Sequence, residues 1–349
     1  MLFYHKNFIH TKQIFMALPT KKTCVLAFLL FISAQLFAQI NTDTIPSVKN
    51  NPGIYSLLIS QNNKLICQKY FNGHTDHELF NNQSLTKSVM SLLIGIAIEK
   101  GNIKSVDEKI VDFFPTLKND PDKRKQTITI RQIMNQASGL YHEDLTRLDL
   151  YLNLPDPSGY VLNAPLLSEP GKVFHYSNAT THLLSVILTK STGMDTRAFA
   201  AKYLFTPLGI TNFDWPKLHD GYYDGAGLLA LRLQTSDMIK IGSLLLHSGV
   251  YNGKQVVPSK WITQLLHPDI TYPTEWGLDQ STYGLCWYHN VYKGTEVTYG
   301  LGWGGQFVMV IPSRNAVIAV NEDPANENAI KQSVTFTTRT FQAIFQQLK

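Results

Sequence analysis

Three short motifs in the sequence contain residue types that could carry out chemistry. In the first, Ser84-Leu-Thr-Lys87, a hydroxyl and an amine are three positions apart. On a helix these two side chains lie on one face, about 5–6 Å apart at Cβ. A neutral amine beside a hydroxyl removes its proton and makes it a nucleophile. The pattern predicts a nucleophilic serine; the alternative is an ordinary helix cap followed by a surface lysine.

The second motif, Tyr176-Ser-Asn178, offers a phenol and an amide. A tyrosine near a lysine ammonium loses its proton more easily and serves as a proton relay. An asparagine binds a substrate amide as donor and acceptor at once. The alternative is a half-buried tyrosine followed by a turn asparagine. Residues 142–144, His-Glu-Asp, either line a cleft or form a solvated loop, and the sequence leaves both interpretations open.

The third motif is the glycine-rich segment Gly300–Gln306, followed by the apolar run Phe307–Pro312. Its glycines match the G-x-G-x-x-G pattern of dinucleotide sites, which requires a strand before it and a helix after it. Here a β-type run follows and ends at a proline, so this interpretation is rejected. We expect instead a glycine-lined strand edge where substrate approaches the backbone closely and N–H groups stabilise an oxyanion.

Composition and charge exclude several other classes of protein. The chain has 349 residues, 44% of them hydrophobic, and three cysteines, which rules out a disordered chain and a disulfide scaffold. Residues 1–38 contain four lysines and no acid, and without them the formal net charge falls from +5 to +1. This balance gives no support for binding of nucleic acid. No zinc spacing or P-loop is present, so neither a metal nor an organic cofactor is expected.

The first motif stands at the start of a predicted buried helix, residues 84–100. Apolar residues recur there at helical spacing, and Gly101 stands where a helix usually ends. At its first residue, Ser84, free backbone N–H groups and the helix dipole favour negative charge. Because the helix is apolar almost all round, Lys87 is expected in a dry environment that disfavours the charged amine.

Strands are predicted on both sides of a helical region. A hairpin is expected at 54–60 and 64–71 around a turn at 61–63, and a last helix at about 328–348. Four further strands are expected at 283–289, 295–301, 305–311 and 316–321. Candidate helices between them cover 129–137, 180–192, 195–204, 235–248 and 258–266. The order predicts an α+β fold, an antiparallel sheet flanked by helices with a mostly helical insert at about 103–280.

Residues 1–38 have the features of a secretory signal. Lys21-Lys22 precede an apolar run from Cys24 to Phe37, and small residues follow. The apolar core of roughly 10–14 residues is shorter than the ~20 needed to cross a bilayer. We therefore expect one domain at 39–349 that is periplasmic or secreted, with no stable membrane anchor after signal cleavage.

Two cysteines remain after the predicted signal, Cys67 and Cys286. Export would permit a disulfide between them. Both stand in apolar runs that predict strands, so two buried free thiols are the favoured interpretation.

Together, the motifs resemble those of the serine β-lactamase and penicillin-binding-protein superfamily. The sequence is most similar to the class C β-lactamase branch, with its esterases and 6-aminohexanoate-dimer hydrolase-like amidases. The resemblance covers residues 54–345. It rests on the order and spacing of Gln83–Val89, Ile128–Leu140, Glu169–Asn178, Phe205–Gly209, Gly225–Leu228 and Thr235–Asp237.

The resemblance implies a role for each motif residue. Ser84 is the acylated nucleophile, Lys87 its general base, and Tyr176 carries the proton to the leaving group. Asn178 stands at the position of a substrate-contacting asparagine. The family's oxyanion hole uses two backbone N–H groups, here that of Ser84 and one within Leu301–Gln306.

The third motif departs from the pattern of penicillin-recognising members, which have K-[ST]-G or H-x-G there. No lysine or histidine stands between Glu296 and Gln306. Trp303-Gly304-Gly305 resembles instead the W-G-G of some esterases, and these three residues are expected to bind substrate. A desolvated β-lactam carboxylate without a cationic partner is costly, so an ester or small amide is favoured over a β-lactam.

We therefore expect an exported serine hydrolase that cleaves an ester or amide bond of a small molecule through an acyl-enzyme on Ser84. The alternative among enzymes is a β-lactamase or a D-alanyl-D-alanine carboxypeptidase. The alternative of another class is a non-catalytic penicillin-binding or sensor protein. The intact Ser84, Lys87 and Tyr176 argue against an inactive site.

Overall fold

The computed structural model describes residues 40–349. The predicted signal at 1–38 lies outside these residues. Within residues 40–349, no helix has both the length and the apolar character needed to span a membrane.

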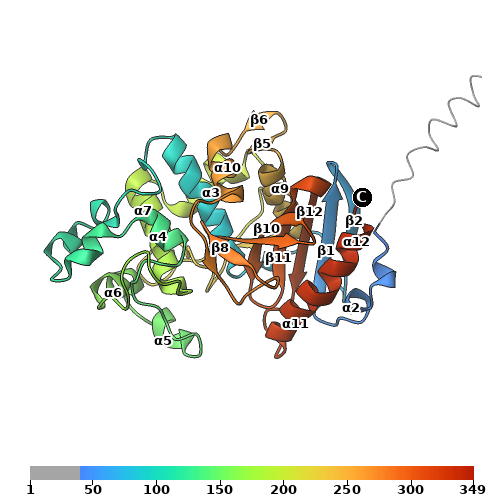
Figure 1. The fold of residues 1–349 in the computed structure, drawn as a ribbon, viewed down its shortest axis with the longest axis horizontal. Helices are drawn as coiled ribbons and strands as arrows, with labels where there is room; N and C mark the ends of the chain where they lie inside the picture. Colours follow the sequence, from blue (N-terminus) through green and yellow to red (C-terminus); the bar gives the residue numbers. More distant parts are fainter. Residues whose placement is uncertain (1–39) are drawn as a thin grey trace, which may run out of the picture. The chain divides into compact units, whose positions relative to one another are not determined.

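An eight-stranded antiparallel sheet forms the centre of the fold, in the order β2-β1-β12-β11-β10-β9-β8-β7 (Figure 1). Two small two-stranded sheets, β3-β4 and β5-β6, stand apart from it. The strands are β1 Ile54–Gln61, β2 Lys64–Tyr70, β3 Phe80–Asn81, β4 Arg232–Leu233, β5 Val250–Tyr251, β6 Lys254–Gln255, β7 Tyr272–Pro273, β8 Thr282–Gly284, β9 Trp287–Tyr292, β10 Thr295–Gly302, β11 Gln306–Ile311 and β12 Ala316–Glu322.

Helices cover both faces of the sheet, and the α+β fold with its antiparallel sheet and flanking helices is confirmed. Besides short 3-10 turns, the helical segments are α2 Pro46–Lys49, α3 Leu85–Glu99, α4 Ile130–Met134, α5 Leu148–Leu152, α6 Pro157–Asn163, α7 Asn178–Thr192, α8 Thr196–Ala200, the π-helical η5 Ala201–Phe205, α9 Thr235–Leu246, α10 Ser259–Leu266, α11 Ala329–Thr335, the π-helical η7 Phe336–Thr340 and α12 Phe341–Gln347.

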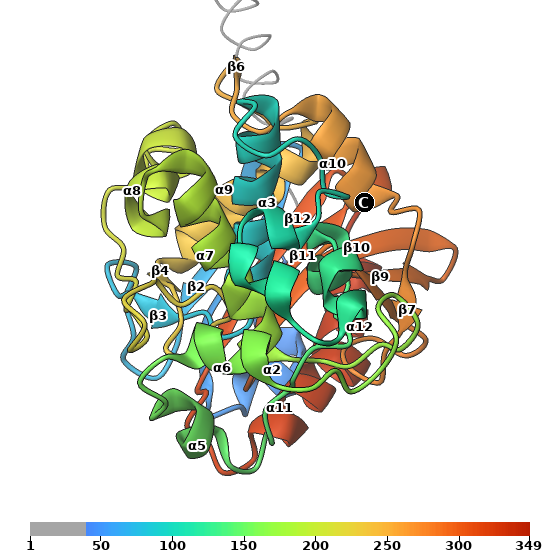
Figure 2. The same ribbon diagram turned by 90° about the vertical axis from the view of Figure 1, so that its left-hand side faces the viewer.

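The alternation of side chains along β11 shows how the two faces divide. Phe307 and Met309 belong to a cluster with residues of η7 and α12, while Val308 and Val310 pack with residues of α3 and α9. Every residue of β11 is buried, as expected for a central strand covered on both faces. Figure 2 shows the helical region, α3 to α8, in front of the sheet.

The predicted β1–β2 hairpin is present, and its turn has a local cause. Asn62 and Asn63 have φ values of 52° and 61°, in the left-handed region that asparagine tolerates better than most residues. The predicted C-terminal helix is also present. It contains a π-helical segment, Phe336–Thr340, between α11 and α12.

The strand predicted at 283–289 is wrong in one respect. The segment is a hairpin, in which β8 ends at Gly284 and β9 begins at Trp287. Leu285 and Cys286 form the turn with φ values of 51° and 67°. Tertiary hydrogen bonds hold this turn, since the Cys286 N–H donates to the Met134 carbonyl at 2.9 Å. The two turn residues are leucine and cysteine, neither of which favours a positive φ, so they give no local turn signal.

The two cysteines are free and buried, as favoured from the sequence. Cys67 lies in β2, whereas Cys286 lies in the β8–β9 turn rather than in a strand. Burial raises the pKa of Cys67 to about 11 and that of Cys286 to about 12. Both thiols therefore stay protonated at neutral pH.

A buried carboxyl group ends β12. Glu322 is 2% exposed; its Oε1 accepts a hydrogen bond from Asn51 Nδ2 at 2.8 Å, and its Oε2 has no partner among the described residues. Gly305 packs against it, and a Cβ at that position would lie 2.2 Å from Oε2. Burial raises the pKa of Glu322 from 4.5 to about 8. The neutral acid is therefore the form that the fold stabilises.

We expect Glu322→Gln to flatten the dependence of stability on pH. In the native protein the carboxyl group keeps its proton up to about pH 8, while in the unfolded chain it loses it near pH 4.5. The stabilisation is complete below pH 4.5 and is lost as pH rises through 8. Each pKa unit corresponds to about 1.4 kcal/mol, so a change of a few kcal/mol is expected.

Urea denaturation at pH 5, 7 and 9 measures this effect. The wild-type free energy of unfolding falls over this range, and that of Glu322→Gln falls less. Glu296→Gln, which removes an exposed acid from β10, serves as the matched control and keeps the wild-type slope. Equal slopes in all three proteins would contradict the assignment.

Candidate active site

The Ser84 hydroxyl lies at the first turn of the buried helix α3 and points toward an amine. Ser84 stands at the N-cap, but its side chain makes no capping hydrogen bond to the helix. Its Oγ is 2.9 Å from Lys87 Nζ. The alternative that Ser84 acts only as a helix cap is therefore not what the structure shows. The preceding residue, Gln83, has φ 50°, a strained conformation of the kind that gathers at functional sites.

Lys87 is 1% exposed, so the surface-lysine alternative is excluded. Besides Ser84 Oγ, its Nζ contacts Asn178 Oδ1 at 2.6 Å and the Ala226 carbonyl at 2.5 Å. None of these three partners carries a negative charge. Because a buried amine must be hydrogen-bonded, these contacts fix where Nζ lies.

Glu143 holds Asn178 in position. One carboxylate oxygen accepts from the Asn178 backbone N–H at 2.7 Å and from its side-chain Nδ2 at 2.6 Å. The other oxygen accepts from the Ala179 N–H at 2.9 Å. A carboxylate at the N-terminus of α7 is also favoured by the helix dipole. The contact to Nδ2 turns the amide so that Oδ1 faces Lys87.

This role for Glu143 was not predicted, since the sequence left residues 142–144 open between a cleft and a solvated loop. The structure resolves that choice, because Glu143 is 2% exposed. Its partners lie 34 to 36 residues further along the chain, so no local pattern could have identified it.

Tyr176 lies beside the same amine. Lys87 Nζ is 4.9 Å from the centroid of the Tyr176 ring, and Ser84 and Tyr176 line the same cavity. The structure therefore brings together Ser84, Lys87, Tyr176 and Asn178 as predicted. Tyr288 packs behind this group; burial raises its pKa well above the usual value, with a further contribution from Tyr176.

The loop after residue 224 supplies the third contact to the amine. Asp224 is fully buried, and its carboxylate accepts from the backbone N–H groups of Ala226, Gly227, Leu229 and Ala230 at 2.7–3.1 Å. Gly227 has φ 93°, and a Cβ there would lie 2.1 Å from the Gln83 carbonyl oxygen. Glycine thus lets this loop close onto the backbone beside Ser84.

The glycines of the third motif were expected to let substrate approach the backbone. Two of them instead let β10 pack closely against other parts of the chain. A Cβ on Gly302 would lie 2.4 Å from the Asn82 carbonyl oxygen, and one on Gly300 would lie 2.8 Å from Ser88 Oγ. Beyond Tyr299, β10 no longer pairs with β9, which leaves the backbone of residues 300–302 unpaired on that edge. Leu301 and Gly302 line the cavity there.

Of the three residues expected to bind substrate in this motif, only the first lines the cavity. Trp303 lines the cavity and is 47% exposed. Gly304 and Gly305 form the β10–β11 turn with φ values of 80° and 103° and are not among the lining residues. A Cβ on Gly304 would face Pro324, so this turn packs against the chain that follows β12.

The cavity above Ser84 has a volume of about 380 Å³. Most of its walls are apolar, and no lysine, arginine or histidine is among the lining residues. The lining residues are Gln83, Ser84, Leu145, Leu148, Tyr176, Asn178, Gly227, Leu228, Glu275, Trp276, Gly277, Tyr288, Leu301, Gly302, Trp303, Ile330, Ser333, Val334 and Thr337.

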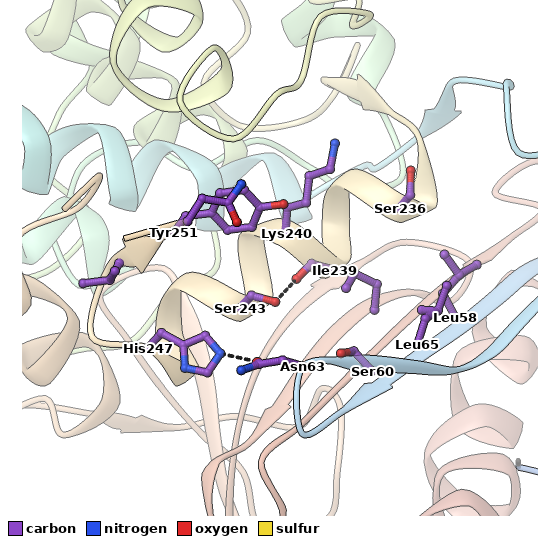
Figure 3. A pocket seen from close by; sticks show the side chains of 12 residues that line it. Leu58, Ser60, Asn63, Leu65, Ser236, Ile239, Lys240, Ser243, His247 and Tyr251 are labelled. Atoms are coloured by element: carbon purple, nitrogen blue, oxygen red, sulfur yellow. Dashed lines mark hydrogen bonds between the residues drawn. The ribbon is translucent and has the colours of Figure 1, made fainter. Parts of the chain in front are cut away.

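Another hollow, of about 450 Å³, lies between the β1–β2 hairpin and α9 (Figure 3). Three of its polar side chains are hydrogen-bonded within the protein, since His247 Nε2 lies 2.6 Å from Asn63 Oδ1 and Ser243 Oγ donates to the Ile239 carbonyl at 2.8 Å. It contains no nucleophile paired with a base. Among the described residues, no cluster of three or more His, Cys, Asp or Glu side chains is arranged to hold a metal.

Solved structures share this fold. A Bacillus anthracis protein provisionally described as a 6-aminohexanoate-dimer hydrolase matches with a TM-score of 0.70 and 21% identity, over 86% of this chain and 81% of that one. A D-stereospecific amidohydrolase from Streptomyces sp. matches with a TM-score of 0.64 and 15% identity, over 85% and 97% of the two chains.

Among curated proteins, Protein flp of Staphylococcus aureus (strain N315) is 26% identical over 173 residues, or 45% of this chain. The match covers 34% of that protein, so the chain spans about a third of its length. A family model described as Beta-lactamase matches residues 42–332, a range that includes Ser84, Lys87 and Tyr176. The chain belongs to the beta-lactamase family, the superfamily of serine β-lactamases and penicillin-binding proteins.

Proposed function

We propose that the protein is an exported serine hydrolase that cleaves an ester or amide bond through an acyl-enzyme on Ser84. The observation that carries this proposal is the 2.9 Å contact between Ser84 Oγ and the buried Lys87 Nζ. The structural similarity to a D-stereospecific amidohydrolase is in accord with this proposal. Export to the periplasm or medium rests on the signal-like residues 1–38.

The proposed mechanism needs Lys87 as a neutral amine, and its three contacts can be assigned on that premise. A neutral amine has two N–H donors and one lone pair. Asn178 Oδ1 and the Ala226 carbonyl are pure acceptors and take the two donors. The lone pair is then left for the third partner, the hydroxyl of Ser84. In this arrangement the hydroxyl donates its proton to Nζ, which is the first step of attack.

Attack forms a bond from Ser84 Oγ to the carbonyl carbon, while the hydroxyl proton moves to Lys87. The negative charge on the carbonyl oxygen falls near the Ser84 N–H, for which the described residues supply no acceptor. The second N–H is assigned to the unpaired edge at residues 301–302. Tyr176 then passes a proton to the leaving oxygen or nitrogen as its bond to carbon breaks. Water hydrolyses the acyl-enzyme and releases the acid.

The lining of the cavity favours an ester or small amide over a β-lactam. A β-lactam carries a carboxylate, and no cationic side chain lines the cavity to receive it. A β-lactamase or D-alanyl-D-alanine carboxypeptidase is the second candidate, supported by family membership. A non-catalytic penicillin-binding or sensor protein is the third. Nitrocefin, D-alanyl-D-alanine peptides and short acyl esters, measured side by side, separate these candidates.

Ser84→Ala is expected to lower turnover of p-nitrophenyl butyrate at least a thousandfold, because no other nucleophile replaces the hydroxyl. A fluorophosphonate is expected to add its mass to the peptide that contains Ser84, as read by mass spectrometry. Ser91→Ala is the matched control on the same helix, since the buried Ser91 hydroxyl has no hydrogen-bond partner. Full activity in Ser84→Ala, or labelling at a different residue, would refute the mechanism.

Glu143→Gln is expected to lower kcat by about 10–100-fold and the free energy of unfolding by about 1–3 kcal/mol. The glutamine side chain would place its own N–H donors against N–H groups that now donate hydrogen bonds to the carboxylate. KM should change less, because Glu143 lies behind Asn178 and does not line the cavity. Asp144→Asn, which removes a neighbouring exposed acid, is the control. A kcat equal to that of the control would contradict the role given to Glu143.

A further inference from the structure

Exposed apolar side chains gather around the mouth of the cavity above Ser84. Leu145, Trp276, Trp303, Ile330 and Val334 all line this cavity, and each is between 40% and 54% exposed. Single exposed apolar residues are ordinary on protein surfaces, but a contiguous set marks a ligand groove or an interaction surface. Their position around one opening points to a ligand that is itself apolar.

These side chains come from separate parts of the chain. Leu145 precedes α5, Trp276 follows β7, and Trp303 follows β10. Ile330 and Val334 are four residues apart on α11, so they lie on one face of that helix. In both Figure 1 and Figure 2, α5 and α11 lie along the lower side of the molecule. An apolar wall thus extends from the nucleophile outward to the surface of α11.

The charge of the cavity restricts its ligand further. Glu275 is the only carboxylate among the lining residues, and no lysine, arginine or histidine lines the cavity. A carboxylate on the acyl group would therefore lose water without gaining a cationic partner. It would also be repelled by Glu275. The lining disfavours acyl groups that end in a negative charge.

We propose that the acyl group of the substrate is an uncharged hydrocarbon chain that reaches from Ser84 to the apolar side chains of α11. The chain leaves the carbonyl at Ser84, passes Trp303 and lies against Ile330 and Val334. This inference rests on the proposed function and adds the substrate class. Each methylene buried fully would raise kcat/KM by about threefold to fourfold, and partial burial gives less.

Four p-nitrophenyl esters test this, with the full chain and each ester below its solubility limit: acetate, butyrate, octanoate and hemisuccinate. The kcat/KM for octanoate is expected to exceed that for butyrate at least tenfold. Hemisuccinate, which has the length of butyrate but ends in a carboxylate, is expected to be at least tenfold slower than butyrate. A flat or falling series, or equal rates for butyrate and hemisuccinate, would overturn the inference.

A charge placed on α11 tests the path of the chain. Val334→Lys is expected to lower the octanoate-to-acetate ratio of kcat/KM at least fivefold, because the ammonium replaces an apolar contact of the acyl chain. It is expected to raise the hemisuccinate-to-butyrate ratio, because the ammonium attracts the carboxylate. Val291→Lys, the same change at an exposed valine of β9 outside the cavity, is the matched control and keeps both ratios. If the two variants give the same ratios, the path along α11 is wrong.

The same measurements distinguish the two proposals. Turnover of the esters without dependence on chain length or charge would overturn the acyl-chain inference and leave the serine hydrolase intact. If no ester is hydrolysed and fluorophosphonate leaves Ser84 unlabelled, the proposed function fails, and the inference fails with it.

Discussion

The buried amine of Lys87 is the constraint on which the rest of the site depends. An amine that is 1% exposed must find hydrogen-bond partners inside the protein or it destabilises the fold. Its partners come from α3, from the N-terminus of α7 and from the loop at residue 226. Three segments that are far apart in the chain are thereby held within hydrogen-bond distance of one atom. The contact that places Ser84 Oγ beside the amine is one of the contacts that satisfy it.

Two buried carboxylates keep those segments in place without touching the amine. Glu143 accepts hydrogen bonds from backbone N–H groups at the start of α7. Asp224 accepts hydrogen bonds from four backbone N–H groups of the loop that contains the Ala226 carbonyl. Because each carboxylate is satisfied by backbone donors, its charge does not have to be compensated by Lys87. This division leaves the amine with neutral partners, in accord with the base role proposed for it. Gly227 and Gly302 then allow backbone to approach the start of α3 more closely than a side chain would permit.

The site also separates reactivity from selectivity. The amine proposed as the base, Lys87, is buried and hydrogen-bonded, whereas the walls of the cavity beyond it include exposed apolar side chains on loops and on α11. Changes in those walls would leave the hydrogen bonds around Lys87 untouched. A fold can therefore keep one chemistry while its members accept different acyl groups, which is why family membership alone does not name the substrate.

Local sequence patterns were enough to predict the helix that Ser84 precedes, the β1–β2 hairpin, the strands from β10 to β12 and the element order of an α+β fold. These follow from hydrophobic period and turn residues, which act over a few positions. Long-range packing, by contrast, buries Glu143 behind Asn178, reverses residues 283–289 at Cys286, and sets Gly304 against Pro324 instead of in the cavity lining. Each of these depends on contacts between residues distant in the chain, such as the 34–36 residues that separate Glu143 from its partners. Local patterns carry no record of such contacts, because they are fixed only when the elements pack together.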